Sequence, residues 1–121
     1  MSTTPSPNLA QGKWAEQIAS AYLAQQGMTI LATNYRSLSG EIDIIAKEND
    51  ILVLVEVKNR KATQKDWLPD AVPPRKIKRI LKTAEKYIEE NKVIFKEMRV
   101  DVIWLIRNKT NYQLIHHRDF A

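Results

Sequence analysis

Apolar residues recur along the chain at two different spacings, and these spacings separate the expected helices from the expected strands. Between Gln11 and Gln26 they return every three or four positions, and Gly27 follows where a glycine commonly ends a helix. A second helix is expected to open at Pro73 and Pro74, because proline is favoured in a first helical turn. Its expected buried stripe consists of Ile77, Ile80, Leu81, Ala84, Tyr87 and Ile88.

The other apolar stretches are short and rich in β-branched residues, which indicates strands. The stretch Ile51–Lys58 opens with a run that is apolar on both faces, as in a strand inside a sheet. The remaining expected strands are Met28–Arg36, Glu41–Lys47, Val100–Ile106 and Tyr112–His116. Turn-forming residues at Ser37–Gly40 and Asn49–Asp50 predict turns, and the polar stretch Asn59–Asp70 predicts a loop. The order of helix, three strands, helix and two strands predicts an α/β fold with helices packed on a mixed sheet.

Composition favours one soluble domain and removes several classes of protein. A chain of 121 residues is long enough to bury a single core. It has no cysteine, which excludes disulfides, thiolate zinc sites and cysteine nucleophiles. Residues 1–10 are polar, so we expect a disordered tail before one domain at 11–121, not a secretory signal. No apolar run approaches the ~18 residues of a membrane helix, so we expect a cytoplasmic protein without a membrane partner.

The basic residues are concentrated in one part of the chain. The net charge is +5, and residues 57–99 contain 13 Lys and Arg against six Asp and Glu. This distribution favours a polyanionic partner such as nucleic acid, although a solvated helix face would give the same pattern. The candidate phosphate-binding residues on the second expected helix and the loop before it are Arg60, Lys61, Lys65, Arg75, Lys76, Lys78, Arg79, Lys82 and Lys86.

Three acids and a lysine interrupt the two most apolar strands. Because side chains alternate along a strand, Glu41 and Asp43 are expected on one face, as are Glu56 and Lys58. A two-residue turn at Asn49–Asp50 would place Asp43 opposite Glu56 and Glu41 opposite Lys58. A four-residue loop would instead place Glu41 opposite Glu56, and a three-residue loop without a bulge would break the arrangement. Two of these three registers bring acids together.

Such an arrangement needs a compensating charge. Carboxylates about 5 Å apart repel by ~3 kcal/mol at an effective dielectric constant near 20, so a shared proton, a salt bridge or a cation must offset the repulsion. Hard oxygen ligands suit Mg²⁺ or Mn²⁺. A lysine two residues from a metal ligand can orient or deprotonate a water bound to the metal. The alternative is that Glu41 and Lys58 form a salt bridge at the sheet edge while Asp43 and Glu56 only end their strands. The pattern leaves both interpretations open.

Two sequence blocks also resemble a known family. GEIDII at residues 40–45 and VEVKNR at residues 55–60 are similar to the D-x(n)-E-x-K signature of the PD-(D/E)XK nucleases. More narrowly they resemble the YraN-type family of small endonuclease-like bacterial proteins. The resemblance runs from about Gly12 to Val102. It also includes Gly12, Glu16, Ala19, Asn34, Arg36, Lys76 and the stretch Arg99–Val102.

The resemblance implies an αβββαβ restriction-endonuclease-like core and an endonuclease dependent on Mg²⁺ or Mn²⁺. By position, Asp43 and Glu56 would hold the metal with the carbonyl of Val57, and Lys58 would be the catalytic lysine. Two further acids would lie nearby, Glu16 as a supporting acid and Glu41 as a candidate ligand. DNA is the implied substrate, with branched structures as one candidate, and relatives of the resolvase type suggest a homodimer.

One departure from the family pattern concerns the substrate. The family usually carries an aromatic–glycine pair after the lysine strand, whereas here Trp67 is followed by Leu68. Because that loop is expected to face the substrate, the departure bears on substrate preference. A nuclease fold can also host a binding module with a vestigial site, and this is the alternative function.

Five other residues are expected to lie outside a metal site. Trp104 lies in an apolar strand and is expected in the core. Trp67 lies in the polar loop and is expected to cap the core, with stacking on an unpaired base as the alternative. His116 and His117 are adjacent on a strand, so they point to opposite faces and cannot jointly bind a metal. Asp101 interrupts a buried strand, and we expect it to be hydrogen-bonded, with Arg99 as the nearest candidate partner.

Overall fold

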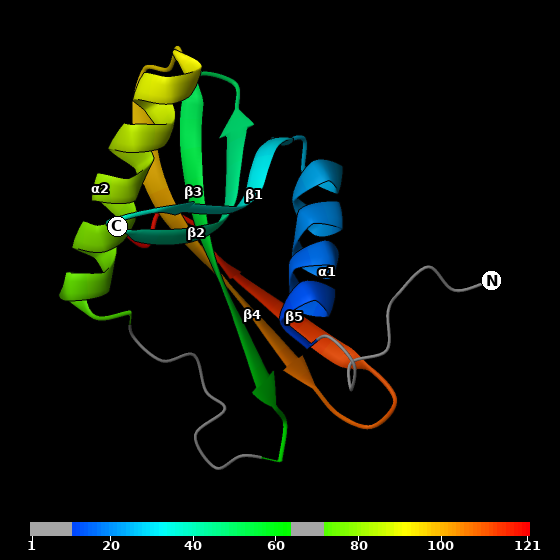
Figure 1. The fold of residues 1–121 in the computed structure, drawn as a ribbon. Helices are drawn as coiled ribbons and strands as arrows, with labels where there is room; N and C mark the ends of the chain where they lie inside the picture. Colours follow the sequence, from blue (N-terminus) through cyan, green and yellow to red (C-terminus); the bar gives the residue numbers. More distant parts are fainter. Residues whose placement is uncertain (1–10, 64–71) are drawn as a thin grey trace.

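The computed structural model describes residues 11–63 and 72–121, which form two helices and one five-stranded sheet (Figure 1). The elements are α1 Gln11–Gln25, β1 Thr29–Ser37, β2 Gly40–Glu48, β3 Ile51–Lys61, α2 Pro74–Asn91, β4 Glu97–Arg107 and β5 Tyr112–His117. The strands lie in the order β1-β2-β3-β4-β5, and β3 with β4 is the parallel pair. The predicted mixed α/β fold is confirmed.

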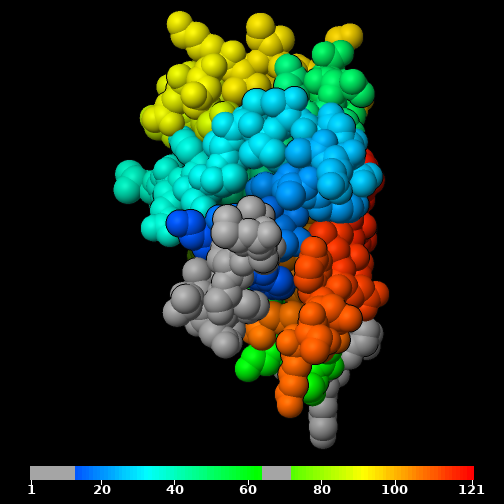
Figure 2. All heavy atoms as spheres, turned by 90° about the vertical axis from the view of Figure 1, so that its right-hand side faces the viewer, coloured from blue at the N-terminus to red at the C-terminus, as the bar shows by residue number. Residues whose placement is uncertain are grey.

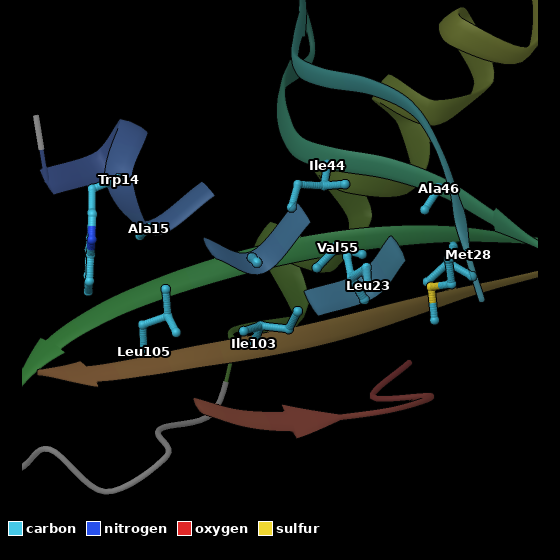
Figure 3. Packing of buried hydrophobic residues seen from close by; sticks show 11 residues of the cluster. Trp14, Ala15, Leu23, Met28, Ile44, Ala46, Val55, Ile103 and Leu105 are labelled. Carbon is cyan, nitrogen blue, oxygen red and sulfur yellow. The ribbon is translucent and has the colours of Figure 1, made fainter. Parts of the chain in front are cut away.

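The two helices cover opposite faces of the sheet (Figure 1). On one side, Leu23 and Ala19 of α1 are fully buried against side chains of β2, β3 and β4, and Figure 3 shows this layer from close by. Seen from the α1 side, the surface includes α1 in blue, β1 in cyan and β5 in orange to red, with the end of α2 in yellow at the top (Figure 2). Neither helix of the described residues is long and apolar enough to cross a membrane.

The turn between β2 and β3 sets the register of the sheet. Asn49 has a φ of 54°, in the left-handed region that asparagine tolerates, and Glu48 pairs with Ile51. The two-residue turn is therefore confirmed over the longer loops. Pairing between β2 and β3 then runs from this turn as far as Ile44 with Val55.

Strict alternation of side chains fails in the middle of β2. Ile42 packs in the cluster beneath α2, whereas Ile44, two residues later, packs in the cluster beneath α1. Opposite this point Asn34 of β1 has a φ of 53°, while β1 and β2 keep the same register on either side. The alternation that predicted a shared face for Glu41 and Asp43 is therefore interrupted at Asp43, where the two strands bend together.

Several predicted boundaries change. The first helix ends at Gln25, one residue earlier than expected, and β3 continues to Lys61 because it pairs with β4 along its whole length. The predicted loop therefore begins later than Asn59. Trp104 is only 1% exposed, which confirms its place in the core. The predicted disordered tail at 1–10 and the predicted roles of Lys65 and Trp67 concern residues outside the described ranges.

The second helix begins as its sequence indicates and ends at Asn91. Pro73 precedes the first residue, Pro74, and Lys92 follows the last one in the left-handed conformation with its φ at 50°. The predicted stripe is confirmed, because its members are buried or packed against the core beneath this helix: Ile77, Ile80, Leu81, Ala84, Tyr87 and Ile88. This packing places the first turns of α2 beside the start of β2 and the middle of β3.

Gly40, the first residue of β2, lies close to α2, and its backbone conformation leads to a first prediction about stability. Its φ is +146°, and an added Cβ would lie 3.5 Å from Thr83 Oγ1, which is an ordinary contact. Because the backbone and not the space disfavours a side chain, Gly40→Ala is expected to lower the free energy of unfolding by about 1–2 kcal/mol. Urea denaturation measures this loss. Ser39→Ala in the same turn should leave stability unchanged, and an equal loss in both variants would contradict the argument.

Candidate active site

Two carboxyl groups lie where β2 and β3 separate. Asp43 and Glu56 are the first residues beyond the last paired positions, Ile44 and Val55. The backbone N–H of Val57 donates a hydrogen bond of 2.8 Å to Oδ2 of Asp43. The Asp43 side chain therefore accepts a hydrogen bond that a backbone carbonyl of the neighbouring strand would accept in a regular sheet. The predicted proximity of Asp43 and Glu56 thus arises at a fork in the sheet.

The surroundings of Asp43 strongly shift its pKa. Burial raises the pKa of Asp43 to about 8, and its hydrogen bond with Glu56 and repulsion from the charges of Glu56 and Glu16 act in the same direction. The hydrogen bond from the N–H of Val57 opposes the rise in this pKa. A carboxyl group held in its protonated form by burial and by an acidic neighbour is a common mark of a functional site.

A lysine from α2 contacts the second acid. Glu56 is 8% exposed, and its Oε2 is buried without a hydrogen bond of ordinary geometry to the described residues. Nζ of Lys76 lies 2.5 Å from that oxygen, and the Lys76 side chain is itself 46% exposed. The two groups therefore form an ion pair with one buried partner and one partner that reaches solvent.

These groups open into a hollow of about 380 Å³ between the sheet and the start of α2. Its lining residues are Gly40, Glu41, Asp43, Glu56, Pro73, Arg75, Lys76, Arg79 and Ile80. Acids thus line the sheet side and cations line the helix side. A site with this distribution can hold a cation against the sheet and an anion against the helix.

Glu16 and Glu41 lie near this pair without joining it. Burial raises the pKa of Glu16, which a hydrogen bond from Asn34 partly opposes. Glu41 forms an ion pair of 3.5 Å with Arg36, its partner across β1 and β2. Within the described ranges, no group of three or more acids or histidines is close enough to hold a metal ion. The structure therefore brings Asp43 and Glu56 together, with Glu16 and Glu41 farther away.

Lys58 lies farther along β3 than these acids. It pairs with Trp104 of β4 and is half-buried, and it is not among the residues that line the hollow. The predicted opposition of Glu41 and Lys58 is wrong, because pairing between β2 and β3 stops before it reaches them and Glu41 pairs with Arg36.

The basic residues of the second helix divide into two groups. Arg75, Lys76 and Arg79 line the hollow, whereas Lys78 and Lys82 are exposed outside it. The ion pair between Lys76 and Glu56 is the feature that the sequence did not indicate. Proline at the helix start places Lys76 in the first turn, but only the docking of α2 on the sheet shows which acid it meets.

A second polar cluster lies on the α1 face. Asp101 is fully buried and accepts hydrogen bonds from Arg99 Nε at 2.9 Å and from the N–H of Asp119 at 2.9 Å, and His116 Nε2 lies 2.9 Å from it. His116 also contacts the hydroxyl of Tyr22 through Nδ1 at 2.9 Å. The predicted structural role of Asp101 beside Arg99 is confirmed. A hollow of about 530 Å³ borders this cluster, but its arginines already pair with acids.

Comparison with known sequences gives one consistent family. A family model described as "Uncharacterised protein family UPF0102" matches residues 15–105. A UPF0102 protein of Syntrophotalea carbinolica is 37% identical over 108 residues, which are 89% of this chain and 88% of the relative. A UPF0102 protein of Syntrophus aciditrophicus is 45% identical over 97 residues, which are 79% of this chain and 76% of the relative. The matched span contains Glu16, Asp43, Glu56 and Lys76.

Among solved structures, the chain is similar to Pyrococcus furiosus SfsA, described in complex with Ca²⁺. The TM-score is 0.40 and the sequence identity is 16%. The alignment covers 89% of this chain, which spans 62% of the length of that structure.

Proposed function

This chain belongs to the UPF0102 family, and for it we propose the function of an Mg²⁺- or Mn²⁺-dependent endonuclease that hydrolyses phosphodiester bonds of DNA. The observation that carries the proposal is the carboxyl pair of half-buried Asp43 and buried Glu56 at the fork of β2 and β3. The pair is unfavourable in its ionised form, and a divalent cation would relieve that repulsion.

The donor set fits a hard divalent cation. Asp43 and Glu56 offer carboxylate oxygens, and Glu56 Oε2 is buried without a hydrogen bond of ordinary geometry in the described ranges. Mg²⁺ is usually bound by one or two carboxylates and keeps several waters, so two acids are sufficient. When bound, the cation would stabilise negative charge on the phosphate and acidify water. The carbonyl of Val57 is the third ligand that the sequence resemblance suggests.

The protein residues have separate tasks in this proposal. The N–H of Val57 fixes the orientation of Asp43, so one of its oxygens stays directed by the backbone. Arg75 and Arg79 line the helix side of the hollow, where they would bind phosphate oxygens without reading sequence. Lys58 remains the catalytic lysine that the resemblance suggests, with the task of orienting the attacking water.

Nucleic acid is the proposed partner because of the basic surface beside the hollow. Arg75, Lys78, Arg79 and Lys82 of α2 are exposed, and Arg60 and Lys61 end β3. Contacts of this kind release counterions, so affinity is expected to fall steeply as salt rises. Branched DNA and a homodimer are proposed from the resemblance to resolvases.

The proposal predicts metal-dependent cleavage. Purified protein is incubated with branched, flapped, linear and single-stranded DNA, and with the same structures in RNA, in Mn²⁺ or Mg²⁺. We expect strand cleavage that EDTA stops and that excess Mn²⁺ restores. Glu56→Gln should lose most of this activity, because one carboxylate of the pair becomes neutral. Glu89→Gln, an exposed neutralisation on α2, serves as the matched control. Equal cleavage by all three proteins would indicate a contaminant and end the proposal.

A second candidate is a nucleic-acid-binding module with a vestigial site. The observation that favours it is the ion pair of Glu56 with Lys76, which already neutralises one acid without any metal. This candidate predicts salt-dependent binding of DNA, no cleavage with any metal, and no heat of metal binding in calorimetry.

A further inference from the structure

The ion pair of Lys76 with Glu56 is unusual for its asymmetry. Glu56 is buried, and the Lys76 side chain that neutralises it is 46% exposed and comes from the first turn of α2. A flexible lysine that reaches solvent can leave this position by rotating about its side-chain bonds. The buried carboxylate cannot follow it, because its strand is paired with β4 along its whole length.

The position of Lys76 is the one a metal ion would need. Its Nζ lies 2.5 Å from Oε2 of Glu56, and both residues line the same hollow as Asp43. Ca²⁺ and Mg²⁺ contact carboxylate oxygens at about 2.0–2.6 Å, so an ammonium and a divalent ion on this oxygen exclude each other. They also repel each other through their charges.

We propose that Lys76 is a built-in counter-ion that occupies the metal position at Glu56 and is displaced when a divalent ion binds. This inference rests on the proposed function, since it assigns a metal to the same acids. Displacement would free the Lys76 ammonium on the helix side of the hollow, next to Arg75 and Arg79. The same movement that admits the metal would therefore add a third cation where the phosphate is expected.

The proposal reverses the usual effect of a mutation at a binding site. Lys76→Met keeps the length and apolar stem of the side chain but removes the competing charge, so Mn²⁺ should bind about threefold to thirtyfold more tightly. In the absence of metal, the same variant should unfold at a lower temperature than the wild type, because Glu56 stays buried without its counter-ion.

The test is calorimetric titration of Mn²⁺ into the folded, DNA-free protein, together with thermal unfolding in EDTA. Lys78→Met is the matched control, since it removes the same charge from an exposed position on α2 outside the hollow. Its Mn²⁺ affinity should change by less than about twofold. Lys76→Arg retains a cation and should keep a dissociation constant near the wild-type value, which covers the case in which Lys76→Met folds poorly.

The outcomes separate the two proposals. If the wild type binds Mn²⁺ and Lys76→Met binds it equally or more weakly, the counter-ion role is wrong while the metal site stands. An affinity gain of the same size in Lys78→Met would also overturn the role of Lys76, because it would show a general effect of net charge. If the wild type binds no Mn²⁺ and cleaves nothing, the proposed function fails and this inference fails with it.

Discussion

Asp43→Asn is expected to abolish metal-dependent cleavage and, at the same time, to make the metal-free protein more stable. The amide reproduces the protonated acid, since its oxygen can accept the N–H of Val57 and its amino group can donate to Glu56. Loss of a metal ligand should lower cleavage by more than about 100-fold, which exceeds the usual effect of residues that only support a ligand.

The gain in stability follows from the raised pKa of Asp43. Its pKa is about 8 in the folded protein, against 3.8 for the unperturbed group, so folding takes up a proton between these two values. The contribution of Asp43 to stability should therefore be greatest below about pH 4 and should fall as the pH rises toward 8. Asparagine takes up no proton, so the variant should exceed the wild type by about 2–4 kcal/mol near pH 8, with the difference vanishing near pH 4.

Urea denaturation in EDTA at several pH values between about 4 and 8 measures this difference. Asp50→Asn removes an exposed carboxylate at the other end of the β2–β3 hairpin and should leave the pH dependence of the wild type unchanged. An inactive variant that is also more stable cannot owe its inactivity to unfolding. A variant that is less stable than the wild type at pH 8 would show that Asp43 is not held in its protonated form.

The acid pair was predictable because its cause is local. Asn49 and Asp50 favour a two-residue turn, the turn fixes the register, and counting back along two strands brings Asp43 to Glu56. The point at which this reasoning fails also depends on local structure. Alternation is a rule for regular strands, and Asn34 in the left-handed conformation bends β1 at the point where it faces Asp43. This bend interrupts the alternation of side chains, and the sequence pattern alone does not reveal where a strand bends.

Lys76 shows what the pattern could not supply. Hydrophobic spacing correctly indicates which stripe of α2 faces the sheet, but it does not fix how far the helix slides along it. A shift of one residue along a helix axis is about 1.5 Å, enough to remove an ion pair. The contact between Lys76 and Glu56 therefore depends on how the whole of α2 docks, which depends on the apolar stripe that ends in Tyr87 and Ile88.

The cluster around Asp101 combines a local contact with distant ones. Arg99 is two residues away, whereas His116 is 15 residues away, and Glu48 is 51 residues from Arg99. Only the first contact could be inferred from neighbouring residues. Together these groups tie β4 to β2, to β5 and, through Tyr22, to α1.

Asp101→Asn is expected to destabilise the protein by about 3–5 kcal/mol, the largest loss of any single exchange considered. Burial by itself raises the pKa of Asp101, but hydrogen bonds from His116, Arg99 and the N–H of Asp119 outweigh it and lower the pKa to about 2. An ionised carboxylate only accepts, so His116 donates from Nε2. An amide would turn its amino group toward one of these donors and leave Arg99 without its buried counter-charge.

The pH dependence of this loss distinguishes it from a simple packing defect. A lowered pKa stabilises the folded state above the unfolded value near 3.9, and that stabilisation disappears as the pH falls toward 2. The difference between wild type and Asp101→Asn should therefore be full at neutral pH and shrink steadily below about pH 4, in thermal or urea unfolding. Asp119→Asn keeps the backbone donor and changes only an exposed carboxylate, so its free energy of unfolding should equal that of the wild type at each pH. A loss of unfolding free energy in Asp101→Asn that stays the same down to pH 2 would mean that packing, and not the charge of the carboxylate, holds β4 to its neighbours.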